Sequence, residues 1–188
     1  MVGLMSGGSF VPAEYTGLEG QRVAVVGVSD ASSYGMGTEA QMLARKVASI
    51  LSEHVKEIEV IPAADIDDWV DRNGWEIDYR EVGRGVKADR VVAIDLGGFR
   101  LHEDQTLYKG RASVTITVFD MLEGGKEVFR RRLTDVTYPR TGVVHIQDVS
   151  EDKFRRTFLT ILSEQLARHF YRYDGFSKSA HDGAFVLQ

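Results

Sequence analysis

Three consecutive segments with the features of β-strands, joined by two reversals, constrain the fold of this chain more than any other feature. The middle segment, Arg111–Asp120, places apolar and polar residues alternately, with Ala112, Val114, Ile116 and Val118 on one face and Ser113, Thr115 and Thr117 on the other. This period of two is typical of a strand that is covered on one face. We expect strands at about residues 90–101, 110–120 and 126–138, with positive φ angles in the reversal at Glu123-Gly124-Gly125. The segments therefore predict an antiparallel meander.

Apolar patterns outside the meander predict further strands and helices. Val23–Val28 is a compact apolar run, which is typical of a strand covered on both faces. Thr38 begins a helix with one apolar stripe, which ends near Val55. We also expect a short strand at residues 57–61, two short helices at about 65–71 and 77–86, and a long helix that begins at Ser150. This order predicts an α/β (α+β) fold, in which helices pack on a mixed sheet of about five strands.

The length and composition favour one domain. The chain has 188 residues, of which 43% are hydrophobic, and this is enough for one full core. We expect a flexible, glycine-rich leader at residues 1–20, a single α/β domain at residues 21–173 and a polar tail at residues 174–188. The sequence contains no cysteine, which excludes disulfides, a cysteine nucleophile and a thiolate metal site within these residues.

The charge and the apolar runs limit the partners of the chain. The formal net charge is -5 at pH 7, and nucleic acids and anionic membrane surfaces both favour basic proteins. No run approaches the roughly 20 apolar residues that cross a bilayer. Residues 1–20 also lack the basic start and the apolar run of a signal peptide. We therefore expect a soluble chain that binds no nucleic acid and reaches a membrane only through a lipid anchor that is not present in this chain.

A glycine pattern after the first predicted strand is a candidate phosphate site. Gly35, Gly37 and Thr38 belong to a G-x-G-x-x-A pattern at the start of a helix, where a phosphate could bind. A dinucleotide fingerprint has its first glycine almost directly after the strand, whereas six or seven residues intervene here. The simpler interpretation is that the glycines only let the loop turn into a helix that Thr38 caps. A small nucleotide- or phosphate-binding domain that uses residues 35–38 remains the alternative function.

Other polar patterns have structural interpretations. Asp65, Asp67, Asp68 and Asp71 lack the spacing of a calcium loop and are typical of the solvated face of a helix. The five histidines have no spacing that would place two on one helical face, and no motif marks a serine nucleophile. We therefore expect no catalytic residue, no metal site and no cofactor.

Two strand features concern the shape and charge of the sheet. Arg130 and Arg132 should project from the face opposite Arg131, toward cross-strand partners or solvent rather than toward nucleic acid. The pair Gly97-Gly98 predicts a bulge that curves the sheet, and the alternative is a close approach by a ligand or a neighbouring chain. Neither feature predicts a reaction.

Four segments form one pattern: Ala88-Asp-Arg-Val-Val-Ala-Ile-Asp-Leu-Gly-Gly-Phe99, the strand that ends Val118-Phe-Asp120, Gly124-Gly-Lys-Glu-Val-Phe129, and Tyr138-Pro139. This pattern resembles the core of bacterial envelope lipoprotein domains. The relevant families are the curli-secretion lipoprotein, the lipoprotein activators of penicillin-binding proteins and the amino-terminal domain of TolB. The resemblance covers roughly residues 21–173 and implies a mixed sheet flanked by helices.

The same resemblance implies a function without catalysis. It implies an extracytoplasmic domain, in the periplasm or at the outer membrane, that binds a protein partner of the cell envelope or associates with itself in an assembly or scaffolding role. The edge of the sheet, or the loop between the first two strands of the meander, is the expected contact surface. A lipoprotein needs a cysteine at its processing site, and this chain has none. Leu4-Met-Ser-Gly-Gly8 loosely resembles a lipobox with glycine at the cysteine position, which suggests a trimmed or altered mature form.

Overall fold

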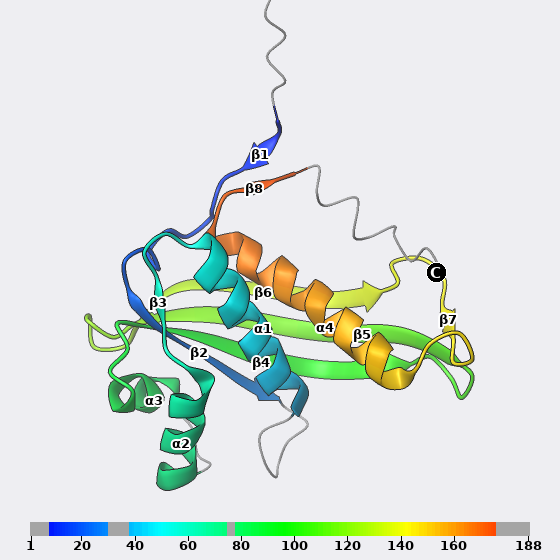
Figure 1. The fold of residues 1–188 in the computed structure, drawn as a ribbon, viewed down its shortest axis with the longest axis horizontal. Coiled ribbons are helices and arrows are strands. Elements are labelled where there is room, and N and C mark those ends of the chain that lie inside the picture. The colour runs from blue at the N-terminus through cyan, green and yellow to red at the C-terminus, as the bar shows by residue number, and fades with distance from the viewer. Residues whose placement is uncertain (1–7, 30–37, 75–77, 176–188) are drawn as a thin grey trace, which may run out of the picture.

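The computed structural model describes residues 8–29, 38–74 and 78–175. Its centre is a six-stranded mixed sheet with the order β3-β2-β4-β5-β6, in which β7 also pairs with β5 (Figure 1). The strands are β2 (Arg22–Ser29), β3 (Glu59–Val60), β4 (Arg90–His102), β5 (Leu107–Asp120), β6 (Lys126–Tyr138) and β7 (Val144–His145). β2 is parallel to β3 and β4, whereas β4, β5 and β6 are antiparallel. The predicted fold class and the predicted meander are confirmed.

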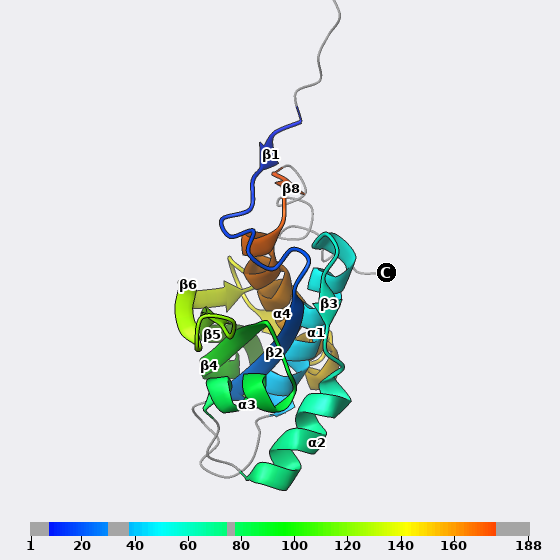
Figure 2. The ribbon, with the colours of Figure 1, turned by 90° about the vertical axis from the view of Figure 1, so that its left-hand side faces the viewer.

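Helices cover the two faces of the sheet unequally (Figures 1 and 2). On one face lie α1 (Thr38–His54) and α4 (Glu151–Ala167), and on the other lie α2 (Ala63–Asn73) and α3 (Tyr79–Gly85). The larger core cluster fills the space beneath α1 and α4. The smaller cluster, beneath α2 and α3, takes its strand residues from β2, β4 and the end of β5. No described helix covers the rest of that second face on β5 and β6.

Apolar and polar residues alternate along β5, and the apolar ones lie on the face that α4 covers. Ala112, Val114, Ile116 and Val118 are at most 3% exposed and belong to the cluster under α4. Ser113 and Thr115 on the opposite face are half-buried, and Thr117 is buried nearer α3. The sequence therefore identified correctly which face of the strand would enter the core.

Register shifts interrupt the pairing of the long strands of the meander. The register between β4 and β5 shifts between Gly97 and Arg100, where Gly98 has a φ of 59°. This confirms the bulge predicted from the paired glycines. A second bulge was not predicted: the register between β5 and β6 shifts between Leu133 and Val136, and Asp135 has a φ of 51°. An aspartate tolerates this left-handed conformation better than most residues, so the sequence signal is weak.

Some predicted boundaries need correction. The second strand is shorter than residues 57–61, because β3 comprises Glu59–Val60. The second short helix begins at Tyr79 rather than near residue 77, since the side chain of Asp78 accepts a hydrogen bond from the Arg80 amide as an N-cap. Gly83 lies in this helix because a Cβ there would be 2.5 Å from Cγ2 of Val91, so the glycine lets α3 pack closely on β4.

The segments at the two ends of the domain pack together. β1 (Phe10–Val11) pairs with β8 (Tyr173–Asp174), and Leu18 is completely buried in the larger core cluster. A leader that is flexible over all of residues 1–20 is therefore wrong for residues 8–20. The prediction of a leader relied on the glycines and missed that Leu18 is part of the larger core cluster and that Tyr15 packs against it. In the described part of the chain, no helix has the length and apolarity that a membrane span requires.

Candidate functional site

The residues that the sequence suggested for phosphate binding are largely outside the described structure. Gly35 and Gly37 lie in the undescribed range 30–37, and Thr38 is described only as the first residue of α1. The nucleotide-binding alternative therefore stays a prediction.

The acidic residues of α2 do not gather around a metal position. Asp67 pairs instead with Arg45 of α1, with 2.8 Å between the carboxylate and the guanidinium. Among the residues that the structure describes, no group of three or more histidine, aspartate or glutamate side chains could hold a metal ion. Asp65, Asp68 and Asp71 are exposed, as the sequence predicted for a solvated helix face.

The arginine run in β6 divides between the two faces of the sheet as predicted. Arg131 lies on the face of α4, and its Nε atom is 2.6 Å from a carboxylate oxygen of Glu14. Arg130 lies on the opposite face and pairs with Glu127 at 2.7 Å. Neither partner lies on a neighbouring strand, so these two ion pairs are not the cross-strand pairs that the sequence suggested, although Arg130 and Arg131 are both exposed to solvent.

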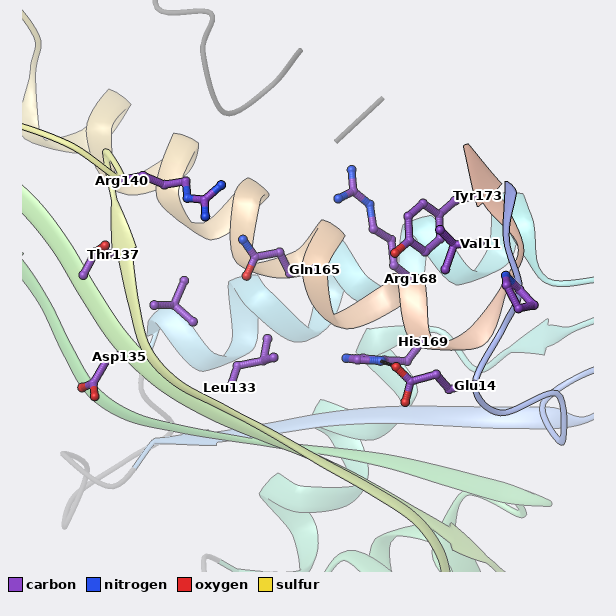
Figure 3. Close-up of a pocket in the computed structure, with 12 residues that line it drawn as sticks. Val11, Glu14, Leu133, Asp135, Thr137, Arg140, Gln165, Arg168, His169 and Tyr173 are labelled. Carbon is purple, nitrogen blue, oxygen red and sulfur yellow. Dashed lines mark hydrogen bonds and ion pairs between the residues drawn. The ribbon is translucent and has the colours of Figure 1, made fainter. Parts of the chain in front are cut away.

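A groove beside β6 is a candidate binding site (Figure 3). It has a volume of about 520 Å³ and lies between the last third of β6 and the end of α4. The strand side is formed by Leu133, Asp135, Val136 and Thr137, the helix side by Gln165, Arg168 and His169, and the remaining lining by Arg140, Val11, Pro12, Glu14 and Tyr173. The groove exists because β6 extends past the part of the sheet that α4 covers.

Arginine side chains lie along this groove. In Figure 3, Arg140, Gln165 and Arg168 follow one another along its helix side. The guanidinium carbon of Arg168 lies 5.1 Å from the centre of the Tyr173 ring, so a cation–π contact restrains this side chain. Gln165 lies in the last turn of α4, and Arg168 and His169 lie in the short 3-10 helix η1 (Arg168–Phe170) that follows it; all three line the groove. Many helix ends carry polar residues at this spacing, so no sequence pattern predicts the groove.

One end of the groove is held by an ionic cluster of Glu14, Arg131 and His169. His169 Nδ1 is 3.0 Å from one oxygen of Glu14, and Arg131 donates to the other oxygen at 2.6 Å. Partial burial raises the pKa of Glu14, but the hydrogen bonds and the positive charge of His169 and Arg131 outweigh this effect and lower the pKa. The backbone carbonyl of His169 also accepts hydrogen bonds from the amides of Glu14 and Tyr15. The cluster thus ties the amino-terminal segment to α4 and β6.

The uncovered face of the meander carries two exposed arginines, Arg100 and Arg132. Across this face, Asp95, Thr115 and Arg132 form one row, and Arg100, Arg111 and Thr137 form another. Arg111 pairs with Glu103 at 2.9 Å, and Asp95 accepts a hydrogen bond from Tyr79 at 2.6 Å. Arg100 and Arg132 are exposed, and neither has an ion-pair partner among the described residues. We call the exposed Arg100 and Arg132, together with the half-buried Ser113 and Thr115, the open face.

Of the comparisons with known proteins, the search of solved structures finds matches. A scan against protein-family models finds no match, and a sequence search of the curated proteins also finds none. The structure is similar to the PelC dodecamer from Paraburkholderia phytofirmans, with a TM-score of 0.51 and 14% identity over 87% of this chain and 96% of PelC. Two other solved structures are less similar. Lipoprotein GNA1162 from Neisseria meningitidis has a TM-score of 0.49 and 14% identity, over 78% of this chain and 96% of that protein. The LpoB C-terminal domain from Salmonella enterica has a TM-score of 0.41 and 13% identity, over 69% of this chain and 84% of that domain.

The similarity to PelC establishes a shared fold and transfers no residue role, because the two sequences are so different. Lipoproteins are among the solved structures that resemble this chain.

Proposed function

We propose that this chain is a non-catalytic assembly or scaffolding domain of the bacterial cell envelope, which works by protein–protein binding and first of all by self-association. The observation that carries the proposal is the open face, a surface of the meander that the described helices leave uncovered, whereas α1 and α4 cover most of the opposite face (Figure 2). A location outside the cytoplasm belongs to the same proposal, and it rests on the resemblance of the sequence to envelope lipoprotein domains.

The fold supports self-association. The similar fold of PelC forms a dodecamer, so this arrangement of helices and strands is compatible with repeated contacts between copies. The open face offers hydroxyl and guanidinium groups, which suit a polar interface with hydrogen bonds and bridging water. Arg100 and Arg132 can reach carboxylates of a neighbouring copy, and the net charge of -5 provides a surplus of these.

Light scattering coupled to size-exclusion chromatography tests this function. We expect the apparent mass of the wild-type chain to rise as its concentration increases from micromolar to near-millimolar. The variant Arg132→Glu should remain monomeric at concentrations where the wild type associates, because the reversed charge meets carboxylates of the neighbouring copy. Lys56→Glu is the matched control: it makes the same change of charge at an exposed residue after α1, far along the sheet from β6.

A wild-type chain that stays monomeric across this range would contradict self-association. Equal association of Arg132→Glu and the wild type would contradict the open face as the contact surface.

A further inference from the structure

The groove beside β6 has the form of a site for an extended peptide. We propose that it binds a short extended segment of a partner protein that carries carboxylate side chains, and that this segment adds alongside β6 as an edge strand. This goes beyond self-association through the open face, because it concerns another surface and another kind of ligand.

The backbone of β6 is available for strand addition. β6 is the last strand in the sheet order, so one side of it pairs with β5 and no described strand pairs with the other side. An extended peptide can form main-chain hydrogen bonds with such an edge, while its alternate side chains enter neighbouring pockets. The groove lies where those side chains would point, since Leu133 and Val136 are on the face of β6 that looks toward α4.

The size of the groove suits a short segment. Its strand side runs from Leu133 to Thr137, which corresponds to about 13 Å of extended chain. The bulge at Asp135 interrupts the regular edge, so a long added strand could not keep its register. A volume of about 520 Å³ lies in the range of sites that enclose a ligand rather than a single ion. The site therefore fits a few residues of a partner.

The charges favour a segment with carboxylates. Arg140 and Arg168 both line the groove, with the amide of Gln165 between them (Figure 3). Of the two acids in the lining, Glu14 is already paired with Arg131 and His169. In Figure 3 the carboxylate of Asp135 points away from α4, so it does not neutralise the positive charge of Arg168 on the helix side. Arginine binds carboxylates in a bidentate geometry, which also fixes the register of the peptide.

A second copy of β6 is a poor occupant. Two copies of this edge in antiparallel register about Arg131 would place the arginines at residues 130–132 of one copy against those of the other. Like charges directly opposite each other destabilise strand pairs. The bulge at Asp135 would further disturb such a pairing. These features disfavour homotypic edge contacts and leave an acidic segment as the better match.

A labelled peptide tests the proposal on the full chain. The probe is fluorescein-labelled Asp-Val-Glu-Val-Asp with blocked ends, and its controls are Lys-Val-Lys-Val-Lys and an acidic peptide with N-methylated valines. We expect fluorescence polarisation to show binding of the unmodified acidic peptide and of neither control. The lysine peptide is positively charged like the groove, and the methyl groups of the other control remove main-chain hydrogen-bond donors. Amides at residues 133–138 should exchange more slowly with deuterium when the acidic peptide is bound.

Substitutions of residues that line the groove test whether the peptide binds there. Arg168→Glu and Gln165→Glu should each weaken binding of the acidic peptide by about tenfold or more. Gln165→Glu keeps the contact between Arg168 and Tyr173, so it remains informative if Arg168→Glu disturbs folding. Lys56→Glu should change the affinity by less than about twofold, since it lies outside the groove.

Three results would overturn the proposal: no binding of the acidic peptide, equal binding of the lysine peptide, or binding without slower exchange at residues 133–138. Light scattering on the same samples tests self-association separately. Gln165→Glu leaves the open face unchanged, so this variant should lose peptide binding and still associate with itself.

Discussion

Helices cover one face of the meander and leave most of the other open, and this difference separates residues that stabilise the fold from residues that face solvent. Under α4, the side chains of β5 are buried among aromatic residues such as Phe158, which is completely buried. On the open face, Thr115 lies between Asp95 and Arg132 with no described helix above it. The same strand therefore stabilises the fold with one set of residues and presents the other set to solvent. Substitutions on the two faces should have opposite consequences.

The largest effect on stability should come from the covered face. Ile116→Ala should lower the free energy of unfolding by about 4 kcal/mol, because it removes buried methyl groups and leaves a cavity under α4. Thr115→Ala, the neighbouring residue on the open face, should cost less than about 1 kcal/mol. Urea denaturation of both variants measures this contrast. Equal losses would mean that the open face is also covered by something that stabilises the fold.

A second large effect on stability should come from the end of β5, at the turn that connects it to β6. Asp120 pairs with Arg90 at 2.8 Å, and its side chain also accepts hydrogen bonds from the amides of Leu122 and Glu123. Both partners of the ion pair are nearly buried. Asp120→Ala should cost about 3 kcal/mol, because it leaves the Arg90 charge without its partner. Glu123→Ala, at an exposed position in the same turn, is the control, and thermal unfolding of the two variants would show whether the pair or the turn sequence matters.

How far the sequence predicted these features depends on the range of the interactions. The alternation in Arg111–Asp120 and the Gly97-Gly98 pair are local signals, so the meander, its covered face and its first bulge could be predicted. The groove depends on where α4 ends relative to β6, and residues more than thirty positions apart line it. The contact of Glu14 with His169 spans 155 positions. No pattern within one segment reports such distances, and the polar residues of the groove look like ordinary surface residues.

A smaller, pH-dependent effect should come from the ionic cluster at the groove. The pKa of Glu14 is lowered in the folded state, so its ionised form stabilises the fold above the pKa of the unfolded chain, and this contribution is lost as the pH falls through the folded pKa. The difference in stability between the wild type and Glu14→Gln should therefore be present near pH 7 and vanish in strongly acidic solution. It should stay below about 1 kcal/mol, because the side chain is partly exposed. Denaturation at a series of pH values tests this, and a difference that grew on acidification would be contrary to it.

The smallest effect on stability should come from the open face itself. Arg132→Glu should change the free energy of unfolding by no more than about 0.5 kcal/mol, because Arg132 is exposed and has no ion-pair partner among the described residues. Arg131→Glu, one residue earlier, should cost more, since it reverses the charge beside Glu14. Thermal unfolding of the two variants compares the faces at adjacent positions. A large loss in Arg132→Glu would show that the open face is part of the stable core.

Sedimentation velocity of the wild type and of Arg132→Glu, over one concentration series, tests most directly whether the open face binds another copy of the chain. We expect the sedimentation coefficient of the wild type to rise with concentration, whereas the variant, folded and equally stable, should keep the monomer value. A constant monomer value for both proteins would contradict self-association through the open face.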